Sequence, residues 1–475
     1  MGVRDRLDRS LLIVFAVAGA LSSGCGRTHV QAPGERALIV TTSDVIAKTS
    51  PCGCHTPKGG FARRAAFMDS VRAVRDNRDA VLALDAGGFF PVVEDERDAG
   101  AFTLAAMARM GVAAAGVGAN DLRFGYSYLR EHARAAGVPL LAANLERRDT
   151  HASAFERWRL FHAGGVAVGA FSLMPESADL GPARDSLVTT SAVNAARAAV
   201  DSLRAAGAAV TVLLSQLGEP WGDSLVARVP GIDLIVQGGG MVPVRADGRR
   251  IGRTVAIEGG TQGWQVGVAE VRPGSGGGSP RLDARTIVLG PEYPMQPAMA
   301  ASVKAFEDSL NASLRARKAA FTAPGGTSGP HYVGMSNCVN CHASEYAQWQ
   351  TTAHSHAWKT LADQHKESTP SCVPCHVTAL GEPGGFQTAD DASRFGNVQC
   401  EACHGMGSDH KRWVDHGSAV PEATCRGCHT AETSPTFSMA AYRPHVLHDP
   451  PPGLQPLPES PAAKLMRSGQ HPHIR

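Results

Sequence analysis

Between residues 37 and 289 the chain alternates short apolar runs with segments whose apolar residues recur at helical spacing. Short apolar runs bounded by turn residues are typical of buried strands, and apolar residues three or four positions apart are typical of helices that pack on a sheet. The pattern therefore predicts an α/β domain at residues 36–290. The expected strands are Ala37–Thr42, Ala80–Asp85, Val138–Ala143, Val166–Phe171, Val210–Ser215 and Ile232–Val236, and the expected helices are Arg63–Asp76 and Val193–Ala206.

A second pattern begins after residue 290. Apolar residues at helical spacing predict one long helix at Ala298–Phe321, and the glycine- and proline-rich stretch after it is typical of a linker. We therefore assign residues 291–330 to a helix and linker. The expected apolar face of the helix comprises Val303, Phe306, Leu310 and Leu314.

Three further segments complete the expected organisation. Arg272–Pro280 is rich in glycine and is expected to be a flexible hairpin loop. Residues 331–448 form a second domain of short polar segments, and the proline-rich residues 449–475 lack periodicity and are predicted to be a disordered tail. A chain of 475 residues is long enough for two or three domains. Its 46 basic and 44 acidic residues argue against a nucleic-acid partner or a polybasic membrane surface.

The N-terminal residues 1–25 have the pattern of an export signal. Basic residues precede the apolar stretch Leu11–Leu21, and small residues precede Cys25. The sequence Leu21-Ser22-Ser23-Gly24-Cys25 resembles a bacterial lipoprotein box, which implies a lipid anchor on Cys25, and Gly26 at the next position favours the outer membrane. The alternative is an uncleaved anchor helix, although the apolar stretch is short for a membrane span. Both alternatives place the rest of the protein outside the cytoplasm, on the periplasmic side or the outer-membrane surface.

The pattern Cys-x-x-Cys-His occurs four times between residues 338 and 429. Two cysteines at this spacing can form thioethers to the two vinyl groups of one haem, and the next residue then provides an imidazole to the iron. Zinc binding is the alternative, but a zinc site does not need a histidine directly after every second cysteine. We therefore predict four haem c groups, whose macrocycles supply apolar mass to a domain of helices and loops. The motifs comprise Cys338, Cys341 and His342; Cys372, Cys375 and His376; Cys400, Cys403 and His404; and Cys425, Cys428 and His429.

The residues around these motifs resemble the tetrahaem cytochrome c family that accepts electrons from hydroxylamine oxidoreductase. The matching segments are Tyr332-Val333-Gly334, Trp349 through Thr352 to His354, Val398-Gln399 before the third motif and Gly405 directly after it, Gly407-Ser408-Asp409-His410, and Phe437 through Tyr442 to His448.

The resemblance implies that His354, His410 and His448 are second axial ligands, and that one of the four irons has no second histidine. The spacing does not decide which of these histidines serves which haem. The other histidines of the domain are expected at the surface, although one of them could fill the remaining position. They are His356, His365, His416 and His445.

Seven segments of the α/β domain resemble the 5'-nucleotidase type of metallophosphoesterase, in order and in spacing. The resemblance implies a layered α/β/β/α sandwich with its site in the loops at the strand ends. The segments are Thr42-Ser43-Asp44, Gly59–Arg64, Leu84–Gly88, Gly118–Gly125, Leu214–Gly218, Asp233–Gly239 and Glu258–Gly260.

The metal ligands of that family are nevertheless missing. A two-metal phosphoesterase needs a cage of Asp, His and Asn side chains around both cations. Of the metal-ligand positions that the resemblance implies, only Asp44 keeps the residue of the family. We therefore expect a domain that has lost phosphoester hydrolysis. The replaced positions are Ile46, Gly88, Ala119, Asn120, Gln216, Gly239 and Met241.

One further pair of cysteines lies just after Asp44. Eight of the eleven cysteines belong to the haem motifs and Cys25 to the lipid box, which leaves Cys52 and Cys54. Ligands bind at the carboxyl ends of strands in open α/β folds, and a disulfide across one residue is strained and therefore more oxidising. A redox-active pair, a soft-metal site with His55 and a plain structural disulfide all remain open.

Two classes of function follow. The first is a lipoprotein that carries electrons through four haems to and from partner proteins, in which the α/β domain binds a partner or ligand or contributes a thiol pair. The second is an oxidoreductase that acts on a small nitrogen species at an open iron, or on a sulfur compound at Cys52 and Cys54. Residual phosphoester hydrolysis is the variant least supported by the residues present. We favour the first class, because the residues of the motifs already explain it.

Overall fold

The computed structural model describes residues 35–51, 56–74, 77–92, 97–240, 245–274, 278–321, 329–410, 420–431, 433–450 and 452–453. The predictions for the export signal and Cys25, for Cys52, Cys54 and His55, for Met241 and for His416 lie outside these residues, as does most of the expected linker and tail. Within the described part of the chain, no helix is long and apolar enough to cross a membrane.

Two six-stranded sheets form the centre of the α/β part. The first has strands in the order β14-β13-β1-β2-β3-β4, with β1, β2, β3 and β4 parallel and β13 antiparallel to both of its neighbours. Its strands are β14 (Arg281–Val288), β13 (Gln265–Arg272), β1 (Ala37–Thr42), β2 (Val81–Asp85), β3 (Val112–Gly116) and β4 (Leu140–Leu141).

The second sheet has strands in the order β11-β12-β10-β9-β7-β6, and its four central strands are parallel. The strands are β11 (Arg249–Ile251), β12 (Thr254–Glu258), β10 (Leu234–Gln237), β9 (Val210–Ser215), β7 (Val166–Leu173) and β6 (Trp158–Ala163). A separate two-stranded sheet pairs β5 (Leu145–Arg147) with β8 (Leu187–Thr189).

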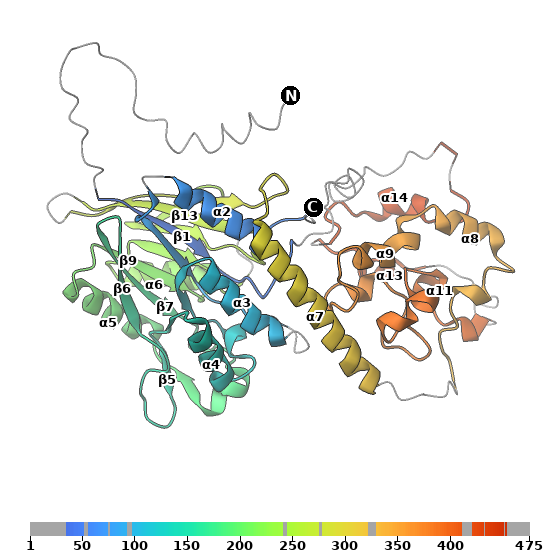
Figure 1. Ribbon diagram of the computed structural model, residues 1–475, viewed down its shortest axis with the longest axis horizontal. Coiled ribbons are helices and arrows are strands. Elements are labelled where there is room, and N and C mark those ends of the chain that lie inside the picture. The colour runs from blue at the N-terminus through green and yellow to red at the C-terminus, as the bar shows by residue number, and fades with distance from the viewer. Residues whose placement is uncertain are drawn as a thin grey trace, which may run out of the picture. The chain divides into compact units, whose positions relative to one another are not determined.

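The two large sheets pack face to face, because apolar side chains of both form one buried cluster that includes Ile39, Leu84, Val212 and Ile257. Helices cover the outer faces, which completes the predicted α/β/β/α sandwich (Figure 1). Every second side chain of a central strand meets the other sheet and the remainder meet helices, which explains their nearly continuous apolar sequences. The helices are α2 (Phe61–Ala73), α3 (Arg97–Arg109) and α4 (Tyr126–Ala136) on the first sheet, and α5 (Ala192–Ala205) and α6 (Glu219–Arg228) on the second.

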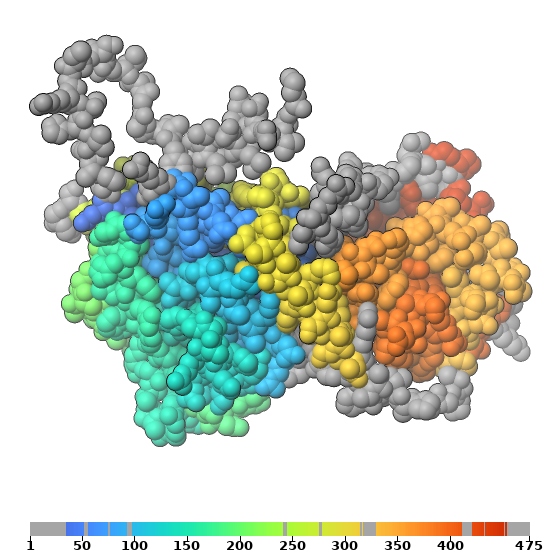
Figure 2. All heavy atoms as spheres, viewed as in Figure 1, coloured from blue at the N-terminus to red at the C-terminus, as the bar shows by residue number. Residues whose placement is uncertain are grey.

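The predicted long helix is present as α7 (Pro297–Phe321). It lies across the surface of α2 and α3 (Figure 2), where the ring of Phe306 stacks on that of Phe102 with centroids 4.3 Å apart. Val303 and Leu310 are buried, so the expected apolar face is confirmed for the described side chains. The strands on both sides of the expected hairpin loop form an antiparallel pair, since Arg272 at the end of β13 pairs with Arg281 at the start of β14.

The element bounds differ from the prediction mainly at Val138–Ala143. Only Leu140–Leu141 form a strand, because the N–H groups of Ala142 and Ala143 donate to the carbonyls of Glu156 and Ser172 instead of continuing along β3. Ser172 belongs to β7, so the chain leaves the first sheet here and turns towards the second.

The C-terminal part consists of short helices and loops, as predicted. Its polypeptide core is small and is formed by Leu361, Val373, Val377, Phe386 and Phe395. The helices are α8 (Ala343–Gln350), α9 (Ala357–Ala362), α10 (Ala392–Phe395), α11 (Cys400–His404), α13 (Glu422–Arg426) and α14 (Met439–Tyr442), joined by 3-10 turns such as η6 (Met335–Asn337), η7 (Ala353–His356) and η8 (Val373–Cys375).

Candidate functional site

The first, third and fourth Cys-x-x-Cys-His motifs each fold into a single α-helical turn, whereas the second forms the 3-10 turn η8, in which the His376 N–H donates to the carbonyl of Val373 at 2.9 Å. The third motif is the helix α11 itself, and the His342 and His429 N–H groups donate to the carbonyls of Cys338 and Cys425 at 3.0 and 2.9 Å. Positions i, i+3 and i+4 of a helical turn lie on one face. The two cysteines and the histidine of a motif therefore point to the same side, as a covalently attached haem requires.

Three of the motif histidines each face a histidine from elsewhere in the chain. The ring centroids are 6.1 Å apart in all three pairs, although the interplanar angles differ. The pairs are His342 with His410, His429 with His354, and His404 with His448.

This separation fits two imidazoles that share one metal ion. A metal–imidazole bond is about 2 Å long, and roughly a further ångström separates each nitrogen from its ring centre, which gives about 6 Å between the two centroids. The donor set and the spacing therefore fit a haem iron with two axial histidines in each pair. Burial lowers the pKa of His354 to about 4, with a smaller contribution from His429, and this favours the neutral imidazole that binds metals.

His376 of the second motif is placed differently. Its Nδ1 lies 2.6 Å from the carbonyl oxygen of Ala357, which leaves Nε2 as the free ring nitrogen. The three histidines expected as second ligands all face the other three motifs. The sequence left the pairing open, and the geometry gives His376 no partner from this set.

The motif cysteines approach one another in a fixed order. Cys338 and Cys400 lie close enough for each to influence the pKa of the other, as do Cys375 and Cys428. The pKa of the Cys403 thiol is raised mainly by burial and further by the nearby Cys425. The first motif is thus next to the third, the third to the fourth, and the fourth to the second.

The other candidate site lies at the strand ends of the α/β part, where Asp44 follows β1. The Asp44 carboxylate is buried and accepts hydrogen bonds from the Gly239 N–H at 2.9 Å, the Ser43 hydroxyl at 3.1 Å and the Gln216 amide at 3.3 Å. Burial raises the pKa of Asp44 to about 6, against these hydrogen bonds. The Gln216 amide, which replaces a metal-binding histidine of the resembled family, therefore binds Asp44 directly.

Neighbouring atoms leave no room for a larger side chain at two of the replaced ligand positions. A Cβ atom at Gly88 would lie 2.4 Å from Asp44 Oδ1, and one at Gly239 would lie 2.2 Å from the Gln216 carbonyl oxygen. Both glycines also have positive φ angles of 73° and 82°, which disfavour larger residues. Among the described residues, no group of three His, Cys, Asp or Glu side chains could hold a metal ion. The described residues of this site do not form the cage of a dinuclear metal centre.

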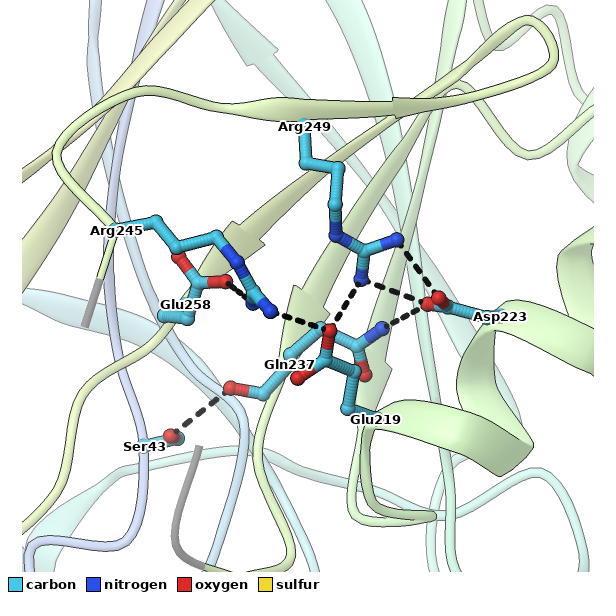
Figure 3. Close-up of polar contacts among 7 residues, drawn as sticks. All are labelled: Ser43, Glu219, Asp223, Gln237, Arg245, Arg249 and Glu258. Atoms are coloured by element: carbon cyan, nitrogen blue, oxygen red, sulfur yellow. Dashed lines mark hydrogen bonds and ion pairs between the residues drawn. The ribbon is translucent and has the colours of Figure 1, made fainter. Parts of the chain in front are cut away.

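A network of ion pairs borders the same strand ends (Figure 3). Arg245 binds Glu219 at 2.9 Å and Glu258 at 2.8 Å, and Arg249 binds Glu219 at 3.1 Å and Asp223 at 2.7 Å. Gln237, at the end of β10, connects the network to the strand ends. Its side-chain amide donates to Asp223, and its backbone carbonyl accepts a hydrogen bond from the Ser43 hydroxyl. The acidic side chains are therefore engaged with arginines, and they are not free to bind cations.

The raised pKa of Asp44 predicts a pH-dependent stability. A carboxyl whose pKa is raised from 3.8 to about 6 by folding stabilises the fold fully below about pH 4, and this contribution is lost as the pH rises through about 6. Asp44→Asn should remove this dependence, because Gln216 can rotate its amide to accept from the new side chain. We expect urea unfolding to show the variant gaining roughly 3 kcal/mol on the wild type between pH 4 and pH 8. Parallel stability curves for the two proteins would contradict the assignment.

Comparison with known proteins identifies both parts of the chain. Residues 337–405 match the family described as cytochrome c554 and c-prime. This part of the chain is cytochrome c554-like. A curated relative, cytochrome c-554 of Nitrosomonas europaea, is 30% identical over 100 residues, which cover 17% of this chain and 43% of the relative. The chain therefore matches less than half of the length of that cytochrome c554.

The α/β part has the fold of the 5'-nucleotidases. The 5'-nucleotidase precursor of Thermus thermophilus superposes with a TM-score of 0.52 at 23% identity, over 58% of this chain and 59% of that one. The sulfate thiohydrolase SoxB of Thermus thermophilus superposes with a TM-score of 0.52 at 18% identity, over 59% and 61% of the two chains. At these identities the comparison establishes the fold alone. The predicted fusion of a metallophosphoesterase-like fold with a cytochrome c554-like region is confirmed.

The structural role of two residues of the cytochrome c554-like part was not predicted from the sequence. Glu401 lies inside the third motif and is 1% exposed, and Gln399 just before it is 4% exposed. Their side chains bind the backbone that leads into the first motif. The signal for Glu401 was an acidic residue at a motif position where the other motifs have Val339, Val373 and Arg426, and the signal for Gln399 was its place in a segment that resembles the cytochrome family.

Proposed function

We propose that the protein carries electrons through four covalently bound haem c groups, one on each Cys-x-x-Cys-His motif. The observation that carries this proposal is the set of three histidine pairs with equal centroid separations of 6.1 Å, each containing one motif histidine. The cytochrome c554 match supports haem-based electron transfer between redox partner proteins. When bound, haem supplies the one-electron chemistry, and the polypeptide holds and spaces the groups.

The residues of the chain divide this work between them. The eight motif cysteines form the thioethers, and the histidine of each motif provides the first axial ligand. The second ligands are His410 for the first motif, His448 for the third and His354 for the fourth. The neighbouring cysteines give the sequence of attachment sites as first, third, fourth and second, so electrons enter or leave at the first and second motifs.

The second motif supports an alternative function. His376 has no partner among the three expected histidines, so an iron held by His376 would lack a second ligand from that set. An open iron is the site at which an oxidoreductase would act on a small nitrogen species. We favour electron transfer over this oxidoreductase function, because electron transfer requires only the four attached haems.

Electron paramagnetic resonance of the oxidised protein tests the proposal. Two strong-field imidazoles make ferric haem low-spin, whereas a single histidine leaves it high-spin. We expect low-spin signals for three quarters of the iron and a high-spin signal for one quarter. Only low-spin signals would contradict the open position at His376, and a protein without haem signals would contradict the whole proposal.

We assign the α/β domain, residues 36–290, to the binding of a partner or ligand, or to thiol redox chemistry through Cys52 and Cys54. The engaged Asp44, the glycines at its sides and the arginine-bound acidic residues support a role without metal ions. The cytochrome domain spans residues 331–448, after a helix and linker at residues 291–330 and before a tail at residues 449–475. A lipid on Cys25, after removal of the signal in residues 1–25, would hold the protein at the outer membrane.

The loss of the metal cage predicts an absence of phosphoester hydrolysis. Purified protein with added manganese should release no phosphate from nucleotides or generic phosphoesters above the buffer blank. Asp44→Ala is the control variant, since it removes the one remaining ligand. Phosphate release by the wild type that disappears in Asp44→Ala would contradict the proposal and would show that the protein hydrolyses phosphoesters.

A further inference from the structure

Glu401 is a buried acidic residue whose hydrogen-bond donors are all backbone N–H groups. It is 1% exposed. Its Oε1 accepts from the N–H groups of Val333 at 2.9 Å and Gly407 at 2.6 Å, and its Oε2 accepts from Gly334 at 2.7 Å. No ion pair involves Glu401 among the described residues. Three N–H donors and no acceptor around a carboxyl group suit the ionised form, which only accepts hydrogen bonds.

These hydrogen bonds tie the first motif to the third. Val333 and Gly334 directly precede η6, the turn that leads into Cys338, whereas Glu401 follows Cys400 in α11. Gln399 reinforces the link, since its Oε1 accepts from the Met335 N–H at 3.1 Å and its amide donates to the carbonyls of α10 and the residue after it. Cys338 and Cys400 consequently lie near each other, and each influences the pKa of the other.

The charge of Glu401 acts on both of these cysteines. Burial is the main cause of the raised pKa of the free Cys338 and Cys400 thiols, and the negative charge of Glu401 adds to both shifts, which places this charge near both sulfurs. The equivalent positions of the other motifs hold Val339, Val373 and Arg426. A fixed negative charge is therefore placed beside the first and third attachment sites, at a motif position that is apolar in the first and second motifs and basic in the fourth.

We propose that Glu401 is a positioning and charge-setting residue that makes the haems of the first and third motifs harder to reduce than the same sites with a neutral residue. The inference rests on the proposed haem attachment. Reduction adds one electron to each iron, and a nearby buried anion opposes this added negative charge. At an effective dielectric constant of about 20, a unit charge roughly 10 Å from a redox centre shifts its equilibrium about tenfold.

Redox titration of the intact haem protein, followed by its optical spectrum, tests the inference. In Glu401→Gln, two of the four midpoint potentials should rise by about 59 mV, which corresponds to a tenfold change for one electron. Glu401→Asp keeps the charge, so each of the four reduction equilibria should change by less than twofold. Gln399→Ala loosens the same backbone without changing charge and should also leave the potentials in place. Glu401→Met is the second neutral variant, with the same expectation as Glu401→Gln.

The haem content of every variant distinguishes a failure of the proposed haem attachment from a failure of the redox role of Glu401. A wild-type protein without four haems would overturn the proposed function itself. If the wild type carries four, the inference is overturned by a Glu401→Gln protein that titrates like the wild type, by equal shifts of all four haems, or by the same shift in Gln399→Ala. Should neither neutral variant take up four haems, Glu401 would serve assembly alone, and the redox role would be overturned.

Discussion

Replacing His354 by alanine should convert one low-spin haem into a high-spin haem. His354 is the partner of His429, at a centroid distance of 6.1 Å, and no other expected second ligand faces that motif. Alanine cannot bind the iron, so the fourth motif would keep one axial histidine and acquire the spin state that we assign to the second. In electron paramagnetic resonance, the high-spin fraction should double from one quarter to one half of the iron.

The chain provides a matched control for this variant. His356 lies two positions further along the same 3-10 turn, η7, but it faces no motif histidine in the described pairs. His356→Ala should leave the spectrum of the wild type unchanged. An unchanged spectrum in His354→Ala, or equal changes in both variants, would show that the pairing of His354 with His429 is wrong.

Much of the fold followed from the sequence because the central strands are buried on both faces. The runs at Ala37–Thr42 and Val210–Ser215 are strands within the predicted bounds. The strand β3 was not predicted, since its Val112-Ala-Ala-Ala-Gly116 sequence is as suitable for a helix as for a strand. The strands and helices that pack against such a segment decide its structure, and they are remote in sequence.

The histidine pairs show a different limit. Spacing identified the motif histidines and resemblance identified the three candidates for second ligands, but neither could pair them. His354 follows the first motif closely in sequence, yet it faces His429 of the fourth. The tertiary fold alone brings these residues together, and it also leaves His376 as the histidine without a partner from this set.

From residue types, the sequence predicts that the α/β site lacks the two-metal cage, because glycine and glutamine cannot replace Asp and His ligands. The sequence did not indicate what takes the place of the metals. In the structure Gln216 binds Asp44, while the buried Asp121 accepts hydrogen bonds from four backbone N–H groups of Gly88, Phe89, Phe90 and Gly118. Hydrogen bonds to the side chains of Asp44 and Asp121 thus link the loops at this site.

Removal of one motif should remove one haem. In the variant with both Cys425→Ser and Cys428→Ser, the fourth motif loses both thioether positions, while His429 and its stacking partner Phe437, with ring centroids 4.6 Å apart, stay in the sequence. Thioether attachment requires the cysteine sulfurs, so we expect three covalent haems in place of four. The matched control replaces Cys52 and Cys54, which lie outside the motifs, and should keep all four.

Intact-mass spectrometry of the denatured protein, expressed with a haem-attachment pathway, measures this count directly. The wild type should have the mass of its processed polypeptide plus four haems, and the variant of the fourth motif should have the mass of its polypeptide plus three. A wild-type mass equal to that of the bare polypeptide would contradict covalent haem attachment and with it the proposed transfer of electrons.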